Sequence, residues 1–164
     1  MKKITPFFIT LLLLFISQTI TSQSIVINEV VASNSTINQD EDGSYQDWIE
    51  IRNNGTTAVN LNNFGLSDDP VLPFKWTFPN VSIGAGQYLL IWCSDKDRAV
   101  AGSPLHTNYK LSSAGETITI TSEAGVTLNT VTTPAMLQNI SYGRIPNGTG
   151  SFMFFNAVTP AAAN

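Results

Sequence analysis

The densest group of side chains that could bind a metal ion is an acidic run over residues 38–43, Asn-Gln-Asp-Glu-Asp-Gly. Oxygen-bearing side chains at alternate positions before a glycine are how a calcium-binding loop begins. The spacing then departs from such a loop, because Ile49 stands where a bidentate glutamate is needed and Glu50 comes one place late. The run therefore predicts either weak Ca²⁺ binding at Asp40 and Asp42 or a solvated turn that holds no ion. We predict no other cofactor.

The residue types that commonly carry catalysis are scattered along the chain. Asp47 and Glu50 could be imagined as a hydrolase pair, but three residues apart on a strand they point to opposite faces of a sheet. His106 is the only histidine, and Cys93, the only cysteine, ends an apolar stretch. Neither a zinc site nor a Cys/His pair is indicated. We predict no catalytic, cofactor-binding or metal-ligating residues, a loop histidine without a special role, and a buried thiol.

Two glutamates in strand-like sequence, Glu29 and Glu50, have few basic residues to pair with, since the chain has 8 Lys and Arg against 12 Asp and Glu. We expect one of them to bind Arg144 or Arg52 through charge-assisted hydrogen bonds that lock strands together.

Three tryptophans, Trp48, Trp76 and Trp92, also stand in strand-like sequence. They could form a platform on which a carbohydrate stacks. Tryptophans in strands more often pack against a core or a sheet face, and we favour that interpretation.

The element on which these residues depend is the stretch 47–55, Asp-Trp-Ile-Glu-Ile-Arg-Asn-Asn-Gly, which is typical of a strand that ends in a tight turn. Side chains alternate across a strand, so Ile49 and Ile51 should face a core while Trp48 and Glu50 face the other way. Residues 25–31 predict another strand, in which Asn28 and Glu29 interrupt the alternation and indicate a bulge.

Further short strands follow along the chain. Residues 74–78 alternate as a half-buried strand, residues 88–93 form an apolar one, and residues 116–130 predict a hairpin that turns at 122–125. Residues 94–108 are polar and look like a mobile segment. No window has a sustained period of 3.6 residues, so we predict a single all-β domain, a sandwich or a barrel.

The first 24 residues have the composition of a secretory signal peptide. Lys2 and Lys3 precede an almost entirely apolar segment over residues 6–16, and small polar residues follow. An uncleaved anchor is the alternative, although the apolar segment is short for a membrane span. Cleavage leaves residues 25–164 as the domain, with 6 of the 8 basic residues against 12 acidic ones, so the formal charge moves from −4 to −6. Such a charge disfavours nucleic acid as a partner.

Short motifs in a fixed order give the chain a family resemblance. It resembles the lamin-tail domain in the version found on exported bacterial proteins. The motifs are Ile27-Asn28-Glu29, Asp47-Trp48-Ile49-Glu50, Leu66-Ser67-Asp68-Asp69, Trp76 with Pro79, Tyr109-Lys110-Leu111-Ser112, Ser141-Tyr142-Gly143-Arg144, and Thr159-Pro160 with Asn164. The resemblance implies an immunoglobulin-like β-sandwich that serves as an interaction and tethering module. Ala161 follows Thr159-Pro160 where glycine is usual in the family.

The function expected from these observations is that of a secreted, non-enzymatic module at the cell surface, in contact with a protein, a glycan or an envelope component. Two alternatives remain open. One is a small extracellular hydrolase or metal-dependent enzyme, which needs a pocket where titratable groups converge. The other is a structural subunit that assembles through an exposed strand edge.

Overall fold

The structure, a computed structural model, describes residues 24–164. Within this range the chain forms strands and turns and no helix, which confirms the predicted all-β fold. No segment of the described range could therefore cross a membrane as a helix. The signal peptide predicted for residues 1–24 lies outside the described residues, apart from Ser24. The strands are β1 (Ile25–Val31), β2 (Asp47–Asn53), β3 (Val59–Asn60), β4 (Gly65–Ser67), β5 (Trp76–Thr77), β6 (Ser82–Ile83), β7 (Tyr88–Cys93), β8 (Leu105–His106), β9 (Thr117–Thr121), β10 (Thr127–Thr132), β11 (Ser141–Ile145) and β12 (Ser151–Phe155).

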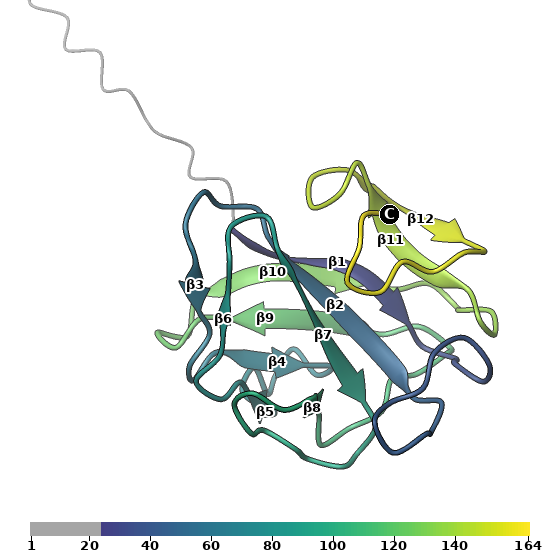
Figure 1. The fold of residues 1–164 in the computed structure, drawn as a ribbon, viewed down its shortest axis with the longest axis horizontal. Helices are drawn as coiled ribbons and strands as arrows, with labels where there is room; N and C mark the ends of the chain where they lie inside the picture. Colours follow the sequence, from purple (N-terminus) through teal and green to yellow (C-terminus); the bar gives the residue numbers. More distant parts are fainter. Residues whose placement is uncertain (1–23) are drawn as a thin grey trace, which may run out of the picture.

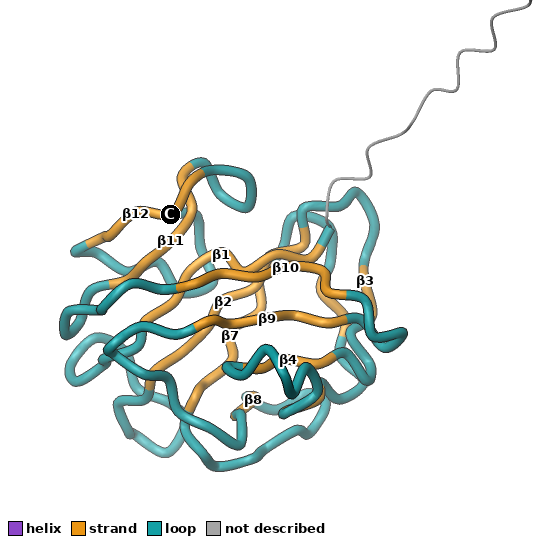
Figure 2. Tube along the Cα trace, turned by 180° about the vertical axis from the view of Figure 1, so that it is seen from behind, coloured by secondary structure: helices purple, strands orange, loops and turns teal. Residues whose placement is uncertain are grey.

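Two sheets face each other. The larger has the order β12-β11-β1-β2-β7-β8, and its neighbours are antiparallel except for β7 and β8. The smaller has the order β10-β9-β4-β5, and β3 pairs with β6 separately. Figure 1 shows the larger sheet in front of the smaller one, and Figure 2 shows the reverse side, with β10, β9 and β4 in front. The β-sandwich predicted from the sequence is confirmed.

The main core lies between the two sheets. Ile49 and Ile51 of β2 are fully buried there, together with Leu66 of β4 and with Ile118 and Ile120 of β9. Full burial of one such aliphatic side chain contributes about 1.5–3 kcal/mol. The alternation read from the sequence therefore assigned the inward face of β2 correctly, and the hairpin of β9 and β10 forms as predicted.

The other face of the larger sheet carries a second, smaller apolar cluster. Trp48 and Trp92 face each other across β2 and β7, and Val31 packs with them. The indole Nε1 of Trp48 donates a hydrogen bond to Asn38 Oδ1 at 2.9 Å. All three tryptophans of the chain are buried, Trp76 in the main core, so the packing interpretation is confirmed and these three rings form no exposed platform.

The strand predicted for residues 74–78 is shorter than expected. Only Trp76 and Thr77 pair with β4, opposite Leu66 and Gly65. Phe74 lies in the preceding turn and is 42% exposed, while Trp76 is buried. The local alternation of aromatic residues continues beyond the sheet because β4, the partner strand, has only three residues.

Candidate functional site

A β-bulge places two consecutive polar residues on one face of the larger sheet. The register of β1 against β2 shifts between Ile27 and Glu29, so that Ile27 opposes Ile51 and Glu29 opposes Glu50. Two residues of a bulged strand share one residue of the partner strand, so Asn28 and Glu29 both lie beside Glu50. All three are fully buried. The bulge predicted at Asn28 and Glu29 is therefore confirmed, and it gathers two carboxyl groups and an amide.

The last described segment, Val158–Asn164, crosses these carboxyl groups and is called the strap below. Thr159 donates two hydrogen bonds to Glu29 Oε2, from its main-chain nitrogen at 3.3 Å and from Oγ1 at 3.0 Å. The main-chain nitrogen of Ala161 donates to Glu50 Oε2 at 2.6 Å. Ala161 has a φ of 60°, a conformation that favours glycine, at the position where the resemblance leads one to expect glycine.

Asn28 connects the bulge to the strap and to the turn between β11 and β12. Its Nδ2 donates to Glu50 Oε1 at 2.9 Å and lies 3.2 Å from Asn147 Oδ1 and 3.4 Å from Asn164 Oδ1. Its Oδ1 accepts a hydrogen bond from the main-chain nitrogen of Gly148 at 2.8 Å. Sequence reasoning missed this role, and only the interruption of the alternation at Asn28 hinted at it.

The electrostatics of the two carboxyl groups follow from this burial. Burial raises the pKa of Glu50 to about 7, although the hydrogen bonds from Asn28 and Ala161 lower it, and the neighbouring Glu29 adds to the rise. Burial also raises the pKa of Glu29, although the hydroxyl groups of Ser141 and Thr159 lower it. Within residues 24–164, neither carboxyl group forms an ion pair. The charged form of this pair is therefore stabilised by neutral donors alone.

The prediction that Glu29 or Glu50 pairs with an arginine is wrong. Glu29 opposes Gly143 of β11, and side chains alternate along a strand, so Arg144 points to the other face of the sheet. Arg52 shares a face with Glu50, but its guanidinium binds the side-chain oxygen of Asn54 instead. The bulge in β1 sets which residue of β1 stands beside each residue of β11. It therefore decided that Glu29 does not meet Arg144.

Arg144 stabilises the fold through carbonyl groups. Its Nε donates to the Ile27 carbonyl oxygen at 2.9 Å, its NH1 group donates to that of Gly150 at 3.0 Å, and the guanidinium carbon lies 4.4 Å from the centre of the Phe152 ring. Arg144→Met should lower the free energy of unfolding by about 2–3 kcal/mol, because two carbonyl groups lose a charged donor. Urea unfolding measures this. Lys110→Met, at an exposed position, is the control and should change it by less than about 0.5 kcal/mol. Equal stability of the two variants would contradict this role.

The acidic run is neutralised by a basic pair from the segment before β8. Lys96 forms ion pairs with Asp40 and Asp42, and Arg98 forms ion pairs with Glu41 and Asp42 at 2.8 and 2.7 Å. Hydrogen bonds from Arg98 and then Lys96 lower the pKa of Asp42 to about 2. Calcium binding at Asp40 and Asp42 stays a prediction, and it requires Ca²⁺ to displace Lys96.

His106 is a buried member of β8 with two polar partners, so the expectation that it lies in a loop is wrong. Its Nδ1 lies 2.8 Å from Ser94 Oγ, its Nε2 lies 2.9 Å from Glu41 Oε1, and its ring stacks on Trp92 with 6.5 Å between centres. A serine, a histidine and an acidic residue in consecutive contact also occur in enzymes that catalyse acyl transfer. Here Ser94 and His106 are both buried, so the arrangement fixes the acidic run against β8.

The predicted burial of the Cys93 thiol is confirmed. Burial raises the pKa of this thiol well above 9, which keeps it in the less reactive protonated form.

Spacing along the chain gave no sign of the Ser94, His106 and Glu41 contact, because its members stand 12 and 65 residues apart.

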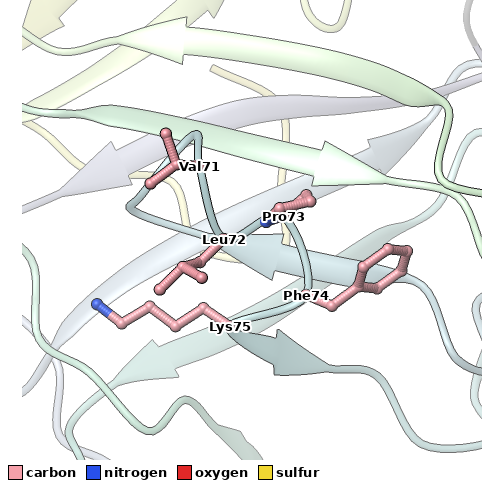
Figure 3. A pocket seen from close by; sticks show the side chains of 5 residues that line it. All are labelled: Val71, Leu72, Pro73, Phe74 and Lys75. Atoms are coloured by element: carbon pink, nitrogen blue, oxygen red, sulfur yellow. The ribbon is translucent and has the colours of Figure 1, made fainter.

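An exposed apolar loop between β4 and β5, residues 68–75 and called the β4–β5 loop below, borders an open surface pocket of about 430 Å³. Figure 3 shows the side chains that line it: Val71, Leu72, Pro73, Phe74 and Lys75. Val71 is 81% exposed and Leu72 is 55% exposed. Large apolar side chains that stand together in water are typical of a contact surface.

Hydrogen bonds between nearby residues hold the β4–β5 loop in shape. The main-chain nitrogen of Val71 donates to Asp69 Oδ1 at 3.0 Å, and that of Leu72 donates to the Asp69 carbonyl at 3.0 Å. Lys75 forms an ion pair with Asp68 at 2.7 Å. Gly65 of β4 lets the loop approach closely, since a Cβ there would come within 2.9 Å of the Phe74 ring. The loop is therefore ordered by its own contacts.

Comparison with known protein families matches residues 18–135 to the family described as Lamin Tail Domain. The match includes β1 to β10 and ends before β11. The motifs Ser141–Arg144 and Thr159–Pro160, which contributed to the resemblance read from the sequence, lie beyond it. A search among curated proteins found no match to the chain.

Proposed function

This chain belongs to the lamin tail domain family, whose members have an immunoglobulin-like fold, and from that premise we propose that it is a secreted, non-catalytic module that binds a protein partner at the cell surface. The contact surface that we assign to this role is the β4–β5 loop.

The observation that carries the proposal is the exposure of Val71, Leu72 and Phe74 on one preformed loop. Loops on a rigid β-sandwich are where such domains commonly bind their ligands. A loop that is already ordered loses little conformational entropy when a partner docks. The pocket that these residues border offers space for an apolar side chain of the partner.

A protein fits this surface better than a glycan. Four of the five residues that line the pocket are Val, Leu, Pro and Phe, and they offer no side-chain hydrogen-bond donor or acceptor. A sugar needs such groups for its hydroxyls. The fifth, Lys75, is already paired with Asp68 and lies 5.0 Å from the centre of the Tyr109 ring.

Support for a non-catalytic role comes from the placement of the titratable groups. Glu29, Glu50 and His106 are fully buried, and the carboxyl groups are engaged by the strap. Enzymatic sites bring such groups to a cavity that a substrate can enter. Support for export comes from the signal-like composition of residues 1–24, and removal of the leader would be seen as a shorter N-terminus in mass spectrometry.

Leu72→Asp tests the proposed contact surface. The full chain, tagged and purified from its expression host, is used to capture proteins from the envelope fraction of the producing cell. Because the variant places a charge beside the pocket, we expect the wild type to retain a defined protein at least ~10-fold more strongly than Leu72→Asp. Quantitative mass spectrometry of the retained proteins measures the ratio.

Val126→Asp is the matched control. Val126 is 60% exposed in the turn between β9 and β10, and the substitution makes the same change in charge and polarity at another surface. This control should retain the partner as the wild type does. Equal capture by all three proteins would contradict the assignment of the β4–β5 loop, and capture that survives protease treatment of the envelope fraction would point to a glycan.

A further inference from the structure

β12 is an edge strand whose outer side has no strand beside it. It ends the order of the larger sheet and pairs with β11 through five consecutive residues without a bulge. Its sequence, Ser-Phe-Met-Phe-Phe, contains no charged residue and no proline. Natural edge strands are usually protected by charges, prolines, bulges or very short length. β12 has none of these protections.

The other sheet edges of the described residues are protected. β10 carries a bulge between Thr127 and Asn129, and the Asn129 side chain accepts a hydrogen bond from the main-chain nitrogen of Ile27 at 3.0 Å. β3, β5, β6 and β8 have two residues each. β12 is therefore the long edge that remains open, and Figures 1 and 2 both show it with β11 beyond the end of the smaller sheet.

Aromatic rings cover one face of this edge. Phe152 and Phe154 lie on the same face as Tyr142 of β11, and their ring centres are 5.0 and 5.1 Å from that of Tyr142. Arg144 extends the group, since it lies over Phe152. Phe154 is 50% exposed, and Met153, on the opposite face, is 53% exposed.

We propose that the partner of this edge is a second copy of the chain, whose β12 pairs antiparallel with the first about a two-fold axis at Met153. In that register Met153 meets Met153 of the second copy, and Phe152 meets Phe154 of the second copy. The two six-stranded sheets become one continuous sheet. Five residues of an antiparallel strand span about 17 Å, so the contact is short and the dimer is in micromolar or weaker equilibrium with the monomer.

The sequence of β12 is complementary to itself in this register. In this register, one row across the joined sheets contains Tyr142 and Phe154 of the first copy, followed by Phe152 and Arg144 of the second copy. The two-fold symmetry produces a second row of the same kind. Aromatic pairs directly opposite each other on neighbouring strands stabilise a sheet. The aromatic contacts already made between β11 and β12 are therefore continued across the new contact.

Charge also favours a second copy at this edge. The chain has a net charge of −4, so two copies repel each other over most of their surface. β12 has no ionisable side chain, so the edge strands of two acidic copies can pair without like charges on the strand itself. An isologous contact of this kind closes on itself, so assembly stops at the dimer.

Sedimentation of the full chain over a range of concentrations tests the proposal. We expect a reversible change from monomer to dimer, strengthened by added salt because salt screens the repulsion between the copies. Met153→Lys and Met153→Glu each place like charges against each other at the two-fold axis, and each should raise the dimer Kd at least ~10-fold. An equal mixture of the two variants should dimerise again, because the charges are then opposite.

The controls separate this inference from a folding defect and from the proposed function. Val126→Lys, at an exposed position outside β12, should leave the Kd unchanged, and circular dichroism should show the same fold for all variants. β12 lies far from β4 and β5 in Figure 1, so Leu72→Asp should dimerise normally. A wild type that stays monomeric at high concentration overturns the proposal. So does a dimer that Met153→Lys does not weaken, or a mixture of the variants that remains monomeric.

Discussion

Replacing Asn28 by alanine should lower the free energy of unfolding by about 3–5 kcal/mol. The substitution removes the donor to the buried Glu50 carboxyl group and leaves the main-chain nitrogen of Gly148 without its acceptor. A hydrogen bond to a charged group contributes about 1.5–3 kcal/mol, and a buried unpaired donor costs about 1–3 kcal/mol. Urea unfolding at a pH above the folded pKa of Glu50, where its carboxyl group is charged, measures the loss. Hydrogen exchange at Ala161 should also become faster, because the strap loses the contact between Asn164 Oδ1 and the Asn28 side chain.

Asn60→Ala is the control for this prediction. Asn60 is exposed, and its Nδ2 donates to Asn80 Oδ1 at 2.8 Å. Because water replaces an exposed partner, this variant should lose less than about 1 kcal/mol. If Asn28→Ala were no less stable than Asn60→Ala, the strap would not depend on the bulge.

The stability of the protein should fall as the pH rises from about 4.5 to about 7. Burial raises the pKa of Glu50 to about 7, so over this range the folded chain binds a proton that the unfolded chain has released. The stability that the protonated Glu50 carboxyl group contributes is fully present below its unfolded pKa of 4.5. It is lost as the pH rises through its folded pKa of about 7. A pKa of about 7 instead of 4.5 corresponds to on the order of 3 kcal/mol. Unfolding in urea at a series of pH values measures the trend.

Other carboxyl groups must be separated from Glu50 in this experiment. Burial raises the pKa of Glu116 to about 7 as well, and it raises the pKa of Glu29 and Asp47. Glu116→Gln removes the contribution of Glu116, and the stability of this variant should still fall over the same pH range. The Glu50 carboxyl carbon, followed by NMR, should titrate with a midpoint near 7. A midpoint near 4.5 in the folded protein would sink this prediction.

The opposite trend belongs to the acidic run. Arg98 and Lys96 lower the pKa of Asp42 to about 2, so the stability that these ion pairs provide is present above the unfolded pKa of 3.8 and is lost as the pH falls through 2. The two trends occupy different pH ranges. The strap can therefore be studied between pH 4.5 and 7 without disturbing the ion pairs before β8.

The sequence alone determined the features that depend on local order along the chain. Alternation with a period of two assigned Ile49 and Ile51 to the core, and its interruption located the bulge at Asn28 and Glu29. Turn residues located the hairpin of β9 and β10. Ordered motifs identified the family, which the match over residues 18–135 confirms. Each of these signals lies within a few neighbouring residues, where backbone geometry fixes the direction of each side chain.

Only the tertiary structure decided which polar groups meet. Asn28 and Asn164 are 136 residues apart, and His106 and Glu41 are 65 apart, so no spacing rule connects them. The face that Arg144 occupies depended on the register between β11 and β1. A buried polar group takes its partner from whatever backbone and side chains the fold brings beside it. The burial of Glu29 and Glu50 therefore required hydrogen-bond partners, and the folding of the strap over the bulge determined that those partners are neutral donors.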